Sequence, residues 1–347
     1  MKTLFYFALF VLCSTVAFSQ TSSRQSVVTK GKAAANEADE NPGEHTYSVP
    51  LEGVKRTFLI YRPTALDAGT KTPVVFAFHG TGGSGEDFFL DSGWQEVADR
   101  EGLTLVFGSA LRYHVFQETK YSKGEVREDV REFTTKWNYL NLPSLLDPKF
   151  VNQKIYDDMK FVQVMVEFVK KNYAVDDERF YATGFSNGGQ FTTRLSLQLT
   201  DTFAAFATTG TINGITSEQV ASVNPYTKAP FKPRPFVQLI GELDGKMFTA
   251  AGLKSFPLDE SALAPGTWLH ETTIKSSTTY MQLKDAYQYH RLKGAASFRY
   301  AQTIAGSGNQ EYDFMIVEGM GHAYPNGEKS KFGVATVFWN FMKRYKR

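Results

Sequence analysis

Residues 179–199 read RFYATGFSNGGQFTTRLSLQL, and this stretch decides the fold that we expect. The apolar run at 179–183 is typical of a short strand, and the pattern at 190–199 is typical of a helix. Between them, residues 184–188 fit G-x-S-x-G, which in that context marks a tight turn that presents a serine hydroxyl at the tip of a sheet. We therefore predict that Ser186 is a nucleophile. The alternative is a glycine-rich turn with a structural serine.

Strands and helices alternate on both sides of this turn. The predicted strands are 54–61, 73–78, 103–107, 179–183, 236–240 and 314–317, and the predicted helices are 94–100, 157–173, 190–199 and 334–345. Continuous apolar runs such as 73–78 are typical of strands buried on both faces of a parallel sheet. The alternation therefore predicts an α/β fold with a doubly wound, mostly parallel sheet.

Two long excursions interrupt the alternation, at residues 109–150 and 246–300. Each follows the carboxyl end of a predicted strand. That is the edge of an open α/β sheet where ligands bind, and long loops in compact domains are usually functional. We therefore expect insertions over the active-site edge.

A serine nucleophile needs a base, because a free hydroxyl is a poor nucleophile at neutral pH. Three histidines follow Ser186 in the sequence: His270, His290 and His322. His322 lies in the glycine-flanked loop GMGHAYP that comes directly after the strand at 314–317. His270 lies in the second excursion, and His290 lies in an expected helix. We predict His322 as the base, because in this fold the histidine follows the acid and lies on the loop after the last strand.

The orienting acid should follow the strand at 236–240, where the sequence continues Gly241-Glu-Leu-Asp-Gly245. We predict that Asp244 holds the imidazole. Glu242 remains the alternative, because alternation along the chain could aim either side chain at the site.

Two backbone amides are predicted to bind the oxyanion. One is the N–H of Asn187, at the start of the helix after the serine. The other is the N–H of Thr81, in the segment His79-Gly-Thr-Gly-Gly83 after the strand at 73–78. His79 is expected to brace this loop through a hydrogen bond.

Together these blocks resemble the esterase family named for poly(3-hydroxybutyrate) depolymerases, which also contains feruloyl and acetyl-xylan esterases. The resemblance rests on residues 173–189, on HGTGG at 79–83, and on Trp137-Asn138, Asp157-Asp158, GELD at 241–244 and GHAYP at 321–325. It implies an α/β-hydrolase fold, with Ser186, Asp244 and His322 as the catalytic triad. The mature chain departs from the family pattern in having no cysteines near the site, and His-Ala-Tyr-Pro replaces the usual His-x-Trp-Pro. These departures leave the acyl preference open.

The charge composition excludes one class of binding partner. The 347 residues carry 38 Lys and Arg against 36 Asp and Glu, so the formal net charge of +2 argues against a nucleic-acid partner.

Residues 1–19 are predicted as a signal peptide, with an N-terminal membrane anchor as the alternative. The single cysteine, Cys13, lies inside it. Residues 20–45 are predicted as a flexible linker and 46–347 as the catalytic domain, so the mature protein is expected to be secreted or periplasmic, without a membrane segment.

The sequence therefore predicts an exported serine carboxylic-ester hydrolase that needs no metal or cofactor. Its expected partner is a small-molecule, oligosaccharide or polyester ester. A serine peptidase of the same fold and a non-catalytic binding protein remain alternatives. Trp137, Asn138 and Tyr324 are candidate substrate-binding residues, although core or surface packing would explain the Trp137-Asn138 pair equally well. Asp157-Asp158 is expected to cap a helix.

Overall fold

The computed structural model describes residues 41–122, 124–215, 219–220, 225–306, 308–327 and 332–347. The predicted signal peptide at 1–19 and the linker up to residue 40 lie outside the described residues. The first strand begins at Gly43, within the last residues of the range 20–45 predicted as linker. None of the helices in the described ranges has the length and apolarity needed to cross a bilayer.

The described residues form one large sheet with the strand order β1-β2-β4-β3-β7-β8-β9-β12-β11-β10. The strands are β1 Gly43–Leu51, β2 Val54–Arg62, β3 Thr72–Phe78, β4 Thr104–Gly108, β7 Val175–Phe185, β8 Ala205–Thr209, β9 Phe236–Gly241, β10 Tyr287–Leu292, β11 Ala295–Tyr300 and β12 Tyr312–Val317. The central strands from β4 to β12 run parallel, and antiparallel pairs close each edge.

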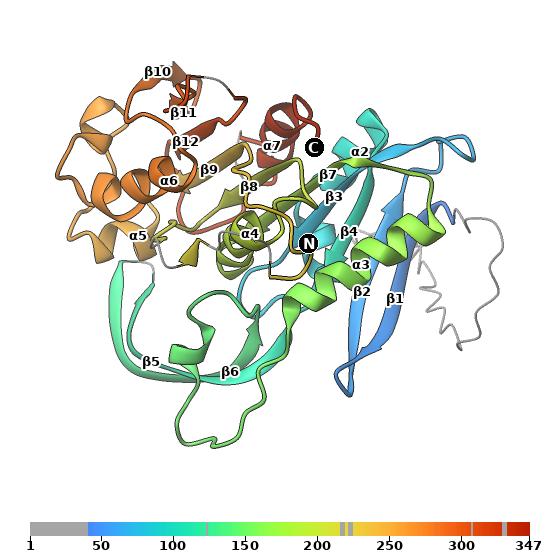
Figure 1. The fold of residues 1–347 in the computed structure, drawn as a ribbon. Coiled ribbons are helices and arrows are strands. Elements are labelled where there is room, and N and C mark those ends of the chain that lie inside the picture. The colour runs from blue at the N-terminus through green and yellow to red at the C-terminus, as the bar shows by residue number, and fades with distance from the viewer. Residues whose placement is uncertain (1–40, 123, 216–218, 221–224, 307, 328–331) are drawn as a thin grey trace, which may run out of the picture.

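Helices cover both faces of this sheet (Figure 1). One face carries α3 Asp158–Asn172 and α4 Asn187–Gln198, and the other carries α1 Gly85–Asp91, α2 Trp94–Glu101 and α7 Val334–Met342. Strand β3 explains why two cores form: Phe76 faces the first core while Val75 and Ala77 face the second. Side chains alternate across a strand, so an uninterrupted apolar run supplies both faces at once.

Helix α3 begins as the sequence predicts. The Asp157 carboxylate accepts hydrogen bonds from the N–H groups of Met159 and Lys160 and caps the helix. The neighbouring Asp158 has a different role. It is fully buried and forms a 2.6 Å ion pair with Arg56 of β2, which ties the start of α3 to the sheet.

The first excursion forms a separate two-stranded hairpin, β5 Leu111–Ser122 with β6 Glu125–Lys136, which curves out beyond the sheet (Figure 1). A short 3-10 helix, η1 Leu142–Leu145, follows it. The hairpin lies close to α5 Gly245–Ala250, the first helix of the second excursion.

The second excursion is shorter than predicted. It contains α5, η3 Glu260–Leu263, η4 His270–Ile274 and α6 Lys275–Tyr280, and then the chain returns to the sheet as β10 and β11. The helix expected around His290 is therefore wrong, because His290 lies on β10. This strand stands at the sheet edge, where most of its side chains are exposed. Its apolar alternation is too weak to distinguish it from a surface helix.

Candidate active site

Ser186 occupies a strained turn between β7 and α4. Its backbone angles are φ 53° and ψ −117°, which are unusual for a residue with a side chain. The turn requires glycine on both sides. A Cβ on Gly184 would lie 2.2 Å from the carbonyl oxygen of Gly188, and a Cβ on Gly188 would lie 2.0 Å from the carbonyl oxygen of Phe78. The G-x-S-x-G pattern thus follows from backbone contact, and it leaves the serine hydroxyl at the carboxyl edge of the sheet.

Three predicted side chains meet at this edge. The Ser186 hydroxyl lies 3.0 Å from His322 Nε2, and His322 Nδ1 lies 2.9 Å from Asp244 Oδ2 and 3.1 Å from Oδ1. Asp244 is fully buried, and the His322 side chain is 15% exposed. The carboxylate requires a proton on Nδ1, because it can only accept. Nε2 is then left as an acceptor for the serine proton.

The acid and the histidine come from the ends of the adjacent parallel strands β9 and β12. The loops after these strands interlock: Leu243 N–H donates to the Met320 carbonyl over 2.8 Å, and a Cβ on Gly241 would lie 2.1 Å from that same oxygen. The alternative acid, Glu242, does not face the site, because its carboxylate accepts a 2.7 Å hydrogen bond from Gly319 N–H.

The two other histidines that follow the serine lie elsewhere. His270 bonds Glu271 and Asp285, and His290 lies on the edge strand β10. Of the three histidines considered, the structure brings only His322 to Ser186.

The loop after β3 is held against the serine turn. His79 Nδ1–H donates to the Gly80 carbonyl over 2.7 Å, and its Nε2 accepts the N–H of Ala110 over 3.0 Å. Burial lowers the pKa of His79 to about 4, so the ring stays neutral and keeps both bonds at ordinary pH. His79 thus braces the loop, as predicted. Thr81 and Asn187, the predicted oxyanion donors, both line the cleft that contains Ser186.

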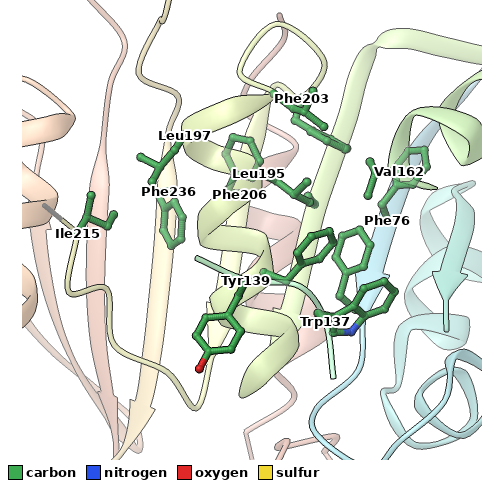
Figure 2. Packing of buried hydrophobic residues seen from close by; sticks show 14 of the residues in the cluster. Phe76, Trp137, Tyr139, Val162, Leu195, Leu197, Phe203, Phe206, Ile215 and Phe236 are labelled. Carbon is green, nitrogen blue, oxygen red and sulfur yellow. The ribbon is translucent and has the colours of Figure 1, made fainter. Parts of the chain in front are cut away.

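Trp137 does not line that cleft. Its side chain is fully buried and lies among the core residues labelled in Figure 2. The indole stacks on Phe191 of α4, with ring centroids 4.9 Å apart and planes at 10°. Its indole N–H donates to the His79 carbonyl over 3.1 Å, and its backbone N–H donates to Asn187 Oδ1 over 2.7 Å. Trp137 is therefore a packing residue, and the prediction that it lines the pocket is wrong. The residue joins the loop after β3 to the serine turn.

The other two candidate substrate-binding residues also have packing roles. Asn138 donates its backbone N–H to Asp158 Oδ2 over 2.6 Å and its side-chain amide to the Tyr156 carbonyl over 3.0 Å. The Tyr324 hydroxyl accepts a 3.0 Å hydrogen bond from the Trp94 indole, and its ring packs edge-on against Phe88. Neither residue lines the cleft at Ser186.

The cleft at Ser186 has a volume of about 470 Å³. Tyr139, Leu145, Gln190, Gly210 and Thr211 line part of it. Most of the remaining wall comes from the hairpin and α5, whose contribution is polar or charged except for Met247. The hairpin and α5 residues are Gln117, Thr119, Lys120, Tyr121, Glu132, Thr134, Lys136, Lys246 and Met247. The excursion at 109–150 reaches the active-site edge, as predicted, although none of these wall residues was among the predicted site residues. The alternating charges of β6, EVREDVREFTTK, were the available signal.

Known esterases resemble parts of this chain in sequence, and solved structures resemble it in fold. No family model matches the chain. A bifunctional acetylxylan esterase/xylanase from Neocallimastix patriciarum is 24% identical over 159 residues, which are 45% of this chain and 18% of that protein. A feruloyl esterase B from Thermothelomyces thermophilus is 27% identical over 148 residues, which are 43% of this chain and 41% of that protein. The matches thus span less than half of these relatives.

Two solved structures share the architecture over most of the chain. An acetyl xylan esterase from Aspergillus awamori superposes with a TM-score of 0.51 at 13% identity, covering 86% of this chain and 98% of that one. An S-formylglutathione hydrolase from Agrobacterium tumefaciens gives a TM-score of 0.52 at 12% identity, covering 92% and 99%. The chain has the α/β-hydrolase fold. This confirms the predicted fold class, and the similarity to esterases is confirmed at the level of sequence relatives. The narrower resemblance to poly(3-hydroxybutyrate) depolymerases stays a prediction.

Proposed function

We propose that this protein is a carboxylic-ester hydrolase that works through Ser186, His322 and Asp244 and an acyl-enzyme intermediate. One observation carries the proposal: the chain of hydrogen bonds from the serine hydroxyl through the imidazole to the buried carboxylate. The strained turn at Ser186 and the sequence similarity to esterases support it.

In the first half-reaction the Ser186 oxygen attacks the ester carbonyl while His322 Nε2 takes the hydroxyl proton. Asp244 stabilises the imidazolium that forms. The carbonyl oxygen becomes an oxyanion, for which the N–H groups of Thr81 and Asn187 are the proposed donors. Collapse of this intermediate breaks the bond to the alcohol, which leaves with the proton from His322.

In the second half-reaction water repeats the sequence. His322 takes a proton from water, the hydroxide oxygen attacks the acyl-serine carbonyl, and the carboxylic acid leaves as Ser186 regains its proton. Each half-reaction returns His322 to its starting neutral tautomer, because the proton taken from the nucleophile is given to the leaving group.

For the substrate, we favour an acetyl or feruloyl ester of a soluble plant oligosaccharide, or a short polyester. The relatives include an acetylxylan esterase/xylanase and a feruloyl esterase, which makes acylated polysaccharide the first class to test. The proposal includes export to the periplasm or the medium, because residues 1–19 have the pattern of a signal peptide.

The decisive variant is Ser186→Ala. We expect kcat/KM for p-nitrophenyl acetate to fall by at least about 10³-fold, because removal of the nucleophile leaves only binding and oxyanion stabilisation. Ser144→Ala is the matched control, since this exposed serine hydroxyl only donates to the Asn141 carbonyl. Both variants should keep the unfolding temperature of the parent protein. Full turnover by the Ser186 variant would overturn the proposal.

Two further measurements separate the alternatives. A matched anilide of acetic acid should be hydrolysed far more slowly than the ester; equal rates would favour a peptidase. A fluorophosphonate probe should label the parent protein and not the Ser186→Ala variant. Absence of labelling on the parent protein would favour a binding protein built on a hydrolase scaffold.

A further inference from the structure

The cleft at Ser186 has an excess of positive charge. Three of its lining residues are lysines: Lys120 on β5, Lys136 at the end of β6, and Lys246 on α5. The single lining carboxylate among the described residues is Glu132. These lysines come from two segments far apart in the sequence, the hairpin and the excursion after Asp244. Their ammonium groups nevertheless share one cavity with the serine hydroxyl.

The carboxylate does not neutralise all three cations. Glu132 forms an ion pair with Lys120. Lys136 and Lys246 have no ion pair with any carboxylate in the part of the chain that the structure describes. Asp244 attracts Lys246, but its carboxylate is buried behind His322 and already accepts the Nδ1 proton. Two of the three lysines in the cleft therefore lack an ion-pair partner among the residues that the structure describes.

Lys136 is the most unusual of the three, because the residue is only 7% exposed. An ammonium group has three N–H donors, and the bond that the structure gives it is 3.1 Å long, to Thr81 Oγ1. Burying a cation without a paired anion is costly, and such groups in proteins are normally paired or serve a function. Its position beside Thr81 puts this unpaired charge on the wall that faces the proposed reaction centre.

The pKa shifts agree with this geometry. Burial, followed by the neighbouring Lys246, lowers the pKa of Lys136 to about 8. Burial, followed by Lys120, lowers the pKa of Lys246 as well. A bound anion would raise both pKa values again, since it favours the charged form of a lysine.

We propose that the substrate carries a carboxylate in addition to its scissile ester, and that Lys136 and Lys246 bind this carboxylate while Ser186 attacks the ester carbonyl. This inference rests on the proposed hydrolase function and narrows its substrate class. The carboxylate could belong to the acyl group, as in a dicarboxylic half-ester, or to the alcohol, as in an ester of an acidic sugar. In both cases the recognised chemistry is the same.

Matched ester pairs test the inference and distinguish the two sources. On the acyl side, monomethyl glutarate is compared with methyl 5-oxohexanoate, in which an uncharged ketone replaces the carboxylate. On the alcohol side, 4-acetoxybutyrate is compared with 5-acetoxy-2-pentanone. The measured quantity is the ratio of kcat/KM for the charged ester to that for its neutral partner. We expect a ratio of at least about tenfold in one of the two pairs, as for a hydrogen-bonded charge pair.

Variants assign this preference to the lysines. In Lys136→Gln and in Lys246→Gln the ratio should fall about tenfold, since each substitution removes one cation and keeps a polar side chain. Lys171→Gln is the matched control, because this exposed lysine at the end of α3 lies outside the cleft, and the parent ratio should persist. Higher salt should lower the parent ratio by screening. If Lys136→Gln does not fold, Lys246→Gln and inhibition of neutral-ester hydrolysis by glutarate provide the same test.

The preference should also depend on pH with a defined sign. The titratable groups that face Lys136 are Lys120, Lys246 and Glu132. Lys136 is cationic below its pKa of about 8, so the ratio should be highest at neutral pH and should decline as the pH rises through and above 8.

The outcomes separate the two proposals. If the neutral esters are hydrolysed in a Ser186-dependent way but both ratios lie near one, the hydrolase function stands and the carboxylate inference is wrong. A preference that survives both lysine substitutions also overturns the inference. Equal losses on charged and neutral esters would mean that the lysines act on the reaction centre and not on a substrate carboxylate. If no ester is hydrolysed, both proposals fail together.

Discussion

The edge of the sheet that holds the reacting groups and the hairpin that faces it are built in different ways. At the edge, a Cβ added at residue 184, 188 or 241 would lie about 2 Å from a main-chain oxygen, which explains why glycines occupy these positions. The wall formed by β5 and β6 depends instead on side chains such as Lys120 and Lys136. The first region fixes where the serine, histidine and acid can lie, and the second determines what can lie against them. The difference suggests that chemistry and specificity in this protein can be altered separately.

After Ser186→Ala, the largest loss of activity should come from Asp244→Asn. The amide cannot hold the imidazole in the tautomer that accepts the serine proton, so kcat for p-nitrophenyl acetate should fall by about 10⁴-fold while the protein stays folded. Glu242→Gln is the control, because it keeps the oxygen that accepts the Gly319 N–H and lies away from His322. If instead Glu242→Gln removes activity and Asp244→Asn does not, the assignment of the acid is wrong.

A second substitution tests whether the sheet edge is as tightly built as its glycines indicate. In Gly188→Ala the new Cβ would meet the Phe78 carbonyl at 2.0 Å and the His79 carbonyl at 2.5 Å. Helix propensity alone would predict a gain of about 1 kcal/mol for alanine at this position in α4. We expect the opposite, a loss of more than about 4 kcal/mol in the free energy of unfolding, because both contacts are with backbone.

Urea unfolding monitored by tryptophan fluorescence measures this loss. Gly214→Ala is the matched control, since its nearest added contact is 3.6 Å and should change stability by less than about 1 kcal/mol. A Gly188→Ala protein as stable as the parent would show that the turn can move, and the close packing of the edge would then not explain the motif.

The same contrast explains what could be predicted from the sequence. The candidate site could be predicted at Ser186, Asp244, His322 and the loop around Thr81. Each of these follows a strand and lies among glycines, and that pattern is set by the main chain. The hairpin lysines of the cleft could not be singled out, because the charges of β6 indicate a polar strand but do not show which face of the curved hairpin meets α5. His290 was assigned to a helix because an exposed edge strand such as β10 buries too few side chains to leave a clear period of two.

A substitution at Trp137 should have the smallest effect of those considered. It tests whether this residue belongs to the sheet edge or to the cleft wall. The tryptophan was a candidate for the pocket, but its ring lies against Phe191 and its indole N–H donates to the His79 carbonyl. Trp137→Phe keeps an aromatic ring and removes that donor, which leaves a buried carbonyl without this partner. We expect a loss of about 2 kcal/mol in unfolding free energy. KM for small esters should stay unchanged, because a fully buried side chain cannot contact them. A raised KM with the unfolding free energy of the parent protein would show instead that Trp137 contacts the substrate and belongs to the cleft.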